Sequence, residues 1–156
     1  MDGKWGNYAW YFLHCIADSC LHRSKQKMTI IATAIKLIPC PECSDDALEW
    51  LANHQNYTDY TTLIIDLHNH VNNKLNKKQF DHMEYEKITS KNIEPSKLLY
   101  FMRFLVENLE TDLSSQLQWR MLWESIKVFP EIIEMQPREP IYDWLCLFTR
   151  PNIHLN

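Results

Sequence analysis

Two cysteines of this chain could carry redox chemistry. Cys40 and Cys43 stand in the motif Pro39-Cys40-Pro41-Glu42-Cys43, where a proline suits the first helical position and acidic residues suit the first turn. At a helix start, the helix dipole and the free backbone N–H groups stabilise a thiolate, and the spacing lets both sulfurs close a disulfide. The same pair could instead be half of a zinc site, which needs further ligands of matching type. The motif by itself leaves both uses open.

The remaining cysteines do not complete a zinc site. The chain has five cysteines and no second CxxC motif. Cys15 and Cys20 lie about 140° apart around a predicted first helix, so they form neither a local disulfide nor a compact clamp. We interpret them as core residues or interface thiols. Cys146, beside Trp144 in an apolar segment, is interpreted as a buried small hydrophobe rather than an electron relay.

A polar stripe crosses a helix predicted further along the chain. Helical spacing puts four of its residues on one face, and we expect that face to point to the core: His68, Val71, Asn72 and Leu75. A buried polar group without a partner costs about 1–3 kcal/mol, so His68 and Asn72 call for a partner. A planar polar ligand would supply one. Contacts with other polar side chains are the alternative explanation.

Positive charge follows the stripe, and an aromatic residue pairs with a histidine on the first helix. Lys74, Lys77 and Lys78 come at the end of the striped helix, where they could pair with a pyrophosphate. Lysines at that position also favour the helix dipole without any ligand. Trp10 and His14 are four residues apart, which places a stacking surface beside a polar group. A core tryptophan with a satisfied histidine has the same pattern.

Composition excludes several classes of protein. The 156 residues are 46% hydrophobic, which is typical of a folded globular chain. The net charge of −4 and the lack of a dense basic run argue against nucleic acid as a partner. Only two glycines occur, so Gly-rich phosphate loops are absent and any nucleotide must be held by side chains on helices. We find no membrane-spanning run and no signal peptide, and therefore expect a cytoplasmic protein.

Hydrophobic periodicity predicts an all-α chain. Four helices are expected over about 5–21, 28–37, 39–53 and 61–77, followed by a connector over 85–96. Three further amphipathic segments are predicted over 96–110, 113–129 and 141–148. We therefore predict a four-helix domain over residues 1–88 and a helical C-terminal extension of unknown role over residues 89–156. We expect the extension's large side chains to add to the core: Trp119, Met121, Trp123 and Trp144.

Three motifs in one order resemble the Erv/ALR family of FAD-linked sulfhydryl oxidases. They are Trp10-Tyr11-Phe12-Leu13-His14, the Pro39 to Cys43 motif, and the run from His68 to Lys77 that continues into Phe80-Asp81. The resemblance covers roughly residues 6–81. It implies a four-helix bundle that holds the flavin beside the CxxC, usually in a homodimer.

The resemblance also implies roles for individual residues. Cys43 would lie next to the flavin as a thiolate, and Cys40 would exchange disulfides with a dithiol protein, either thioredoxin-like or another shuttle. Electrons would pass to FAD and then to molecular oxygen, giving hydrogen peroxide. Besides Cys43, the implied FAD contacts are Gly6, Trp10, His14, His68, Asn69, Val71, Asn72, Lys74 and Lys77.

Three departures from the family pattern accompany this resemblance. Asn7 stands where many members have an arginine, and His82 stands where many have the first cysteine of a further disulfide. The third departure is the absence of a second CxxC for an internal shuttle. Compact members without targeting sequences are typical of large cytoplasmic DNA viruses, so we hypothesise a viral source. The rival interpretations are a helical interaction module with a structural zinc and a catalytically inactive family relative.

Overall fold

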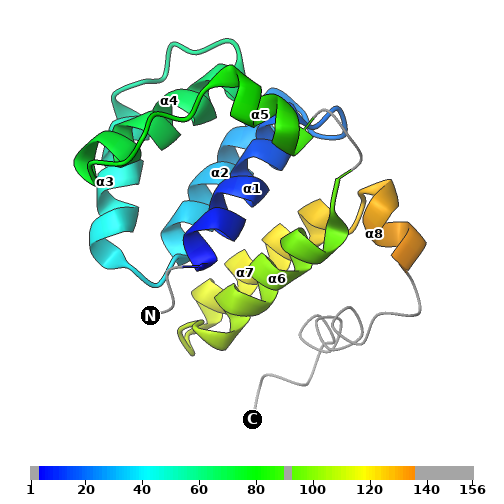
Figure 1. The fold of residues 1–156 in the computed structure, drawn as a ribbon. Helices are drawn as coiled ribbons and strands as arrows, with labels where there is room; N and C mark the ends of the chain where they lie inside the picture. Colours follow the sequence, from blue (N-terminus) through cyan, green and yellow to red (C-terminus); the bar gives the residue numbers. More distant parts are fainter. Residues whose placement is uncertain (1–3, 90–92, 136–156) are drawn as a thin grey trace.

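The chain folds as a set of packed α-helices. The computed structural model describes residues 4–89 and 93–135, and in these ranges it contains eight helices and no strand (Figure 1). The helices are α1 (Trp5–Asp18), α2 (Ser24–Leu37), α3 (Pro41–Ala52), α4 (Tyr60–Lys74), α5 (His82–Thr89), α6 (Pro95–Glu107), α7 (Leu113–Ile126) and α8 (Pro130–Met135). The predicted all-α class is confirmed.

The first four helices form a closed bundle. Each packs on its neighbours in the ring, because α1 contacts α2 and α4 while α3 contacts α2 and α4. Helix α5 packs on α1 from the same side as α4. Helices α6 and α7 lie on the opposite side, where α6 covers α1 and α7 covers α2 (Figure 1). The middle pair, α1 and α2, is therefore sandwiched between the rest of the bundle and the C-terminal helices.

One hydrophobic core runs through both halves. It joins bundle residues such as Phe12, Ile31 and Leu63 to Phe101 and Trp119 of the C-terminal helices, each at most 1% exposed. Full burial of a side chain of this size contributes about 1.5–3 kcal/mol. The expectation of core packing by the extension is confirmed for Trp119 and for Trp123, which is equally buried, and Met121 packs against the core half-buried. Trp144 and Cys146 lie outside the described residues.

Helix α5 corrects the predicted connector over 85–96. The helix spans His82–Thr89, so the first part of that segment is helical. Asp81 accepts a hydrogen bond at Oδ1 from Glu84 N–H (2.9 Å), and Glu84 Oε2 accepts one from Asp81 N–H (3.2 Å). This reciprocal pair is a capping box, which stabilises a helix start. The Asp81-x-x-Glu84 signal was present in the sequence and was overlooked.

Other helix boundaries also differ from prediction: α2 begins at Ser24 rather than near residue 28, and α6 and α7 end at Glu107 and Ile126 rather than near residues 110 and 129. Two further differences have clear local reasons. Helix α1 ends at Asp18 rather than near residue 21, since the Ser19 hydroxyl accepts a hydrogen bond from Leu21 N–H (3.0 Å) and competes with the helical pattern. Helix α4 ends at Lys74 rather than at residue 77, because Asn76 adopts a positive φ of 54°. Asparagine is one of the few residues that tolerate this left-handed helix stop. The predicted helix over 141–148 lies outside the described residues.

Candidate active site

Cys40 and Cys43 form a disulfide at the start of α3. Their Cα atoms are 5.3 Å apart, within the range that a disulfide requires. Cys40 is the N-cap residue and Pro41 is the first helical residue, so α3 begins two residues after the predicted start at residue 39 and still has a proline at its first position. Cys43 N–H donates to Cys40 Sγ (3.4 Å). Cys40 is half-buried and Cys43 is exposed, so the pair is accessible from solvent.

Helices α1 and α4 meet through an aromatic cluster. The rings of Trp10 and His68 stack with centroids 4.0 Å apart and planes 9° from parallel. Phe80, which follows α4, stacks on His68 at 4.5 Å and on His14 at 4.8 Å. The two motifs that the sequence placed on separate helices are therefore in direct contact.

Burial makes both histidines of this cluster poor bases. His14 is fully buried, and desolvation followed by its neighbour His68 lowers its pKa from 6.5 to about 3. Desolvation, followed by the charge of Lys77, lowers the pKa of His68 from 6.5 to about 4. The neutral rings share one hydrogen bond, His14 Nε2 to His68 Nδ1 (3.3 Å). The other ring nitrogen of His14, Nδ1, is buried without a hydrogen-bond partner.

Asn69 and Asn72 hold the loop that follows α4. Asn69 pairs with the backbone of Phe80 in both directions, donating to its carbonyl (2.9 Å) and accepting from its N–H (2.6 Å). Asn72 is 8% exposed and donates to the carbonyl of Lys78 (3.1 Å). These side chains therefore fix Phe80 against the histidines and place Lys77 and Lys78 beside the cluster. The side-chain amide of Asn72, for which the sequence predicted a partner, therefore bonds to the backbone of this loop.

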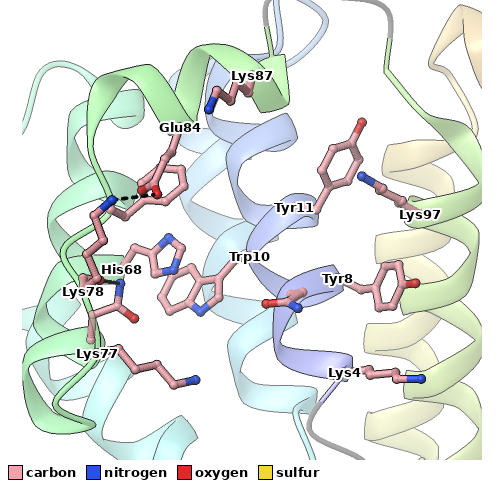
Figure 2. Close-up of a pocket in the computed structure, with 13 residues that line it drawn as sticks. Lys4, Tyr8, Trp10, Tyr11, His68, Lys77, Lys78, Glu84, Lys87 and Lys97 are labelled. Carbon is pink, nitrogen blue, oxygen red and sulfur yellow. Dashed lines mark hydrogen bonds and ion pairs between the residues drawn. The ribbon is translucent and has the colours of Figure 1, made fainter.

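A cavity of about 780 Å³ opens beside the cluster (Figure 2). Its volume is in the range of small-molecule and cofactor sites. Figure 2 shows His68, Lys77 and Lys78 on one side of it and Tyr8 and Lys97 on the other. Five lysines and one glutamate border it, so its charge is opposite to the chain's net charge of −4. The lining residues are Lys4, Asn7, Tyr8, Trp10, Tyr11, His68, Asn72, Lys77, Lys78, Phe80, Glu84, Lys87 and Lys97.

A family sequence model described as Erv1 / Alr matches residues 7–91, which is more than half of the 156-residue chain. This chain belongs to the Erv1/Alr family. No curated protein and no solved structure matches it. Membership of this family supports a function of the sulfhydryl oxidase type, and its members typically bind FAD. The matched segment carries the disulfide, the aromatic cluster and most of the cavity lining.

The structure divides the FAD contacts that the Erv1/Alr resemblance implies into three groups. Trp10, His68, Asn72 and Lys77 border the cavity. His14 and Asn69 lie behind that surface, the first against His68 and the second against the Phe80 backbone. The remaining implied contacts do not border the cavity: Gly6, Cys43, Val71 and Lys74. Cys40 does not border it either.

The prediction that one stripe of α4 residues faces the core is wrong for Leu75. Leu75 is 57% exposed because the helix ends one residue earlier and Leu75 is its C-cap. His68 is half-buried and Asn72 is buried, as that stripe required. At Gly6, an added Cβ would meet no heavy atom within 4 Å, so protein packing does not demand glycine there.

Lys74 serves a contact between two helices. It donates to Asp46 Oδ1, and His70 Nε2 lies 3.0 Å from Asp46 Oδ2. Asp46 is three residues after Cys43 on α3, whereas His70 and Lys74 are on α4. The Lys74 hydrogen bond and, after it, the His70 interactions keep the pKa of Asp46 below its ordinary value despite desolvation. This cluster ties the helix that carries the disulfide to the helix that borders the cavity.

Several residues that line the cavity were not predicted from the sequence. Tyr8 and Tyr11 precede and follow Trp10, and their three-residue spacing is the signal that could have found them. Lys87 and Lys97 come from α5 and α6, and no local pattern connects those helices to Trp10.

The donor set of the cavity fits a flavin dinucleotide. Trp10 and His68 offer aromatic surface, and the lysines offer charge for a diphosphate. Across residues 4–89 and 93–135, no group of three or more His, Cys, Asp or Glu side chains is placed to hold a metal ion. In the same ranges, no helix has the length and apolarity to cross a bilayer.

Proposed function

We propose that this chain is an FAD-linked sulfhydryl oxidase that makes disulfides in a protein substrate. The observation that carries the proposal is a solvent-accessible Cys40–Cys43 disulfide at a helix start, in a bundle whose basic, aromatic cavity suits a dinucleotide. Overall, two substrate thiols and one oxygen molecule give one disulfide and one hydrogen peroxide. FAD, when bound, supplies the two-electron acceptor between the cysteines and oxygen.

The exchange at the cysteines follows ordinary thiol chemistry. A substrate thiolate attacks Cys40 Sγ, the Cys40–Cys43 bond breaks, and Cys43 leaves as a thiolate in the first turn of α3. A second substrate thiolate then attacks the mixed disulfide, so Cys40 leaves and the substrate disulfide forms. The Cys43 N–H that donates to Cys40 Sγ (3.4 Å) stabilises the charge on that leaving sulfur. This supports Cys40 as the exchanging sulfur, the role that the family resemblance implies.

Residues on both sides of the cavity would hold FAD. Trp10 and His68 would contact its ring systems, and Lys77 with Lys78 would pair with the diphosphate. Asn69 and Asn72 would act indirectly, since they hold the loop on which Phe80 and the two lysines lie.

A dithiol protein is the proposed electron donor, because the chain has no second CxxC to relay electrons internally. We also propose a homodimer, the usual state that the family resemblance implies. Its interface has to avoid the faces of α1 and α2 that α6 and α7 cover in this chain. Light scattering of the purified protein measures the mass, and a monomeric mass at micromolar concentration would refute the dimer.

The visible absorption spectrum tests the function first. We expect a yellow protein that consumes oxygen when given dithiothreitol, and a Cys43→Ser variant that keeps the flavin but stops turning over. With the disulfide form of a dithiol protein, the free Cys40 thiolate of Cys43→Ser should displace one substrate sulfur and form a mixed disulfide, and Cys40→Ser should form little through Cys43. A colourless protein that cannot be reconstituted with FAD would refute the proposal. A yellow protein without oxygen consumption would identify an inactive relative instead.

A further inference from the structure

The C-terminal helix α6 packs on an aromatic stripe of α1. Trp5 stacks on Phe104 with ring centroids 5.4 Å apart, and the Tyr8 ring contacts the Tyr100 ring in a tilted arrangement with centroids 4.2 Å apart. Tyr8 also borders the cavity. Helix α6 spans Pro95–Glu107 and therefore lies wholly outside the segment that the family model matches, residues 7–91. The contact between Tyr100 and Tyr8 brings a segment with no counterpart in that match to the edge of the candidate FAD site.

Lys97 is the residue through which α6 reaches the cavity. Its Nζ lies 5.0 Å from the centre of the Tyr11 ring and 3.2 Å from Glu94 Oε2. Tyr11 is 5% exposed, and its hydroxyl accepts the Glu94 N–H (2.7 Å), which anchors the start of α6. An ammonium held over an aromatic face is more ordered than one on a free surface chain. In Figure 2, the Lys97 amine points towards Tyr11 and the cavity.

The five lysines around the cavity favour an anion with more than one negative charge. Its lysines come from four places: the start of α1, the loop after α4, helix α5 and helix α6. One carboxylate, Glu84, borders the cavity with them, at 3.9 Å from Lys78 Nζ. Like charges gathered around one cavity raise its potential and favour a polyanionic ligand. The diphosphate of a dinucleotide meets this requirement.

We infer that the C-terminal extension is part of the FAD-binding site and that Lys97 binds a phosphate group of the cofactor. The inference rests on the proposed function, since it assigns a further contact to the same ligand. Through Lys97 and the contact of Tyr100 with Tyr8, α6 forms one wall of the site in addition to covering α1.

Lys127 offers a matched control for Lys97. Both lysines belong to the C-terminal helices, both pair with a glutamate three residues earlier, and their side chains are 41% and 37% exposed, respectively. Lys127 does not border the cavity. The experiment strips flavin from the full chain, restores it by titration, and measures the FAD dissociation constant of wild type, Lys97→Gln and Lys127→Gln by flavin fluorescence.

A lost charge-assisted contact predicts about ten-fold weaker FAD binding by Lys97→Gln at low salt. Lys127→Gln should stay within about two-fold of wild type, because it changes only the long-range field. Lys97→Glu should bind more weakly than Lys97→Gln. In about 1 M salt, where the Debye length falls to about 3 Å, the gap between wild type and Lys97→Gln should narrow. Chemical denaturation of each variant reports whether the fold is intact.

Two results would overturn the inference: an unchanged FAD dissociation constant in Lys97→Gln, or an equal loss in Lys97→Gln and Lys127→Gln. Either leaves the oxidase proposal standing, since wild type still binds FAD. If wild type itself binds no FAD, the proposed function fails before the variants are compared, and the inference fails with it.

Discussion

The bundle and the C-terminal helices bury different kinds of side chain. Within the described residues, the four buried polar residues all precede α5: His14, Ser19, Ser44 and Asn72. The buried residues of α6, α7 and α8 are all apolar or aromatic. A buried polar group has a cost that apolar packing avoids. The bundle therefore holds all of these polar groups, one of which, Asn72, borders the cavity, whereas the C-terminal helices contribute apolar packing.

Replacement of Trp119 by alanine should give the largest loss of stability. Trp119 is 1% exposed, stacks on Trp123, and donates its indole N–H to Met102 O (3.0 Å). Truncation of such a side chain costs about 3–5 kcal/mol. Urea denaturation measures this loss. No α7 residue borders the cavity, so FAD affinity of the folded variant should be unchanged. A loss below about 1 kcal/mol would contradict the role of the extension in the core.

Acidification should destabilise the bundle through its two buried histidines. The unfolded chain protonates them below pH 6.5, but the folded chain protonates His68 only near pH 4 and His14 near pH 3. Unfolding therefore takes up to two protons between these limits, and the free energy of unfolding falls as the pH falls, by up to about 1.4 kcal/mol per pH unit per proton. Stability is fully restored above pH 6.5.

Denaturation curves from pH 7 to pH 4 measure this slope. His14→Gln should flatten it, and the control His82→Gln, at an exposed position on α5, should not. Equal slopes in wild type and His14→Gln would show that the buried histidine does not carry the effect. No histidine occurs among residues 93–135, so within the described residues the histidine contribution to the slope comes from residues 4–89.

Asp46→Asn should have a moderate effect. The change removes the charge that pairs with Lys74 and His70 between α3 and α4, and we expect the free energy of unfolding to fall by about 1 kcal/mol. The adjacent Asp45→Asn is the control, since Asp45 is exposed. A double-mutant cycle with Lys74→Gln should give a favourable coupling energy between the two side chains. A coupling energy of zero would mean that the pair does not join these helices.

Gly6→Ala should have the smallest effect on stability and a clear effect on the ligand. An added Cβ meets no protein atom within 4 Å, and alanine is favoured over glycine inside a helix by about 0.5–1 kcal/mol. The melting temperature should therefore stay the same or rise slightly. If Gly6 contacts FAD, as the resemblance implies, the FAD dissociation constant should increase several-fold. Unchanged FAD binding would remove Gly6 from the set of contacts.

Sequence reasoning worked best where the signal was local. The α3 start depends on Pro41 and the cysteines beside it, and the polar positions of α4 follow from helical spacing. The predicted helix ends were wrong where a single residue stops the helix before the hydrophobic periodicity ends. Ser19 does so at the end of α1 through its side-chain hydrogen bond, and Asn76 does so after α4 through its positive φ. The sequence predicted a ligand or another polar side chain as the partner of Asn72. In the structure, Asn72 and its neighbour Asn69 bond instead to the backbone of Lys78 and Phe80, which lie beyond the predicted helix end at residue 77.

Local sequence patterns predicted that the chain is helical, that its CxxC motif begins a helix, and that polar residues share one face of α4. These features depend on residues a few positions apart, where helical geometry decides which side chains are neighbours. The helices that border the cavity are set instead by tertiary packing. This packing also pairs Lys74 with Asp46 and brings Lys97 of α6 to the cavity across α1. These contacts depend on packing between residues far apart in the sequence, so the local pattern around each residue does not predict its partner.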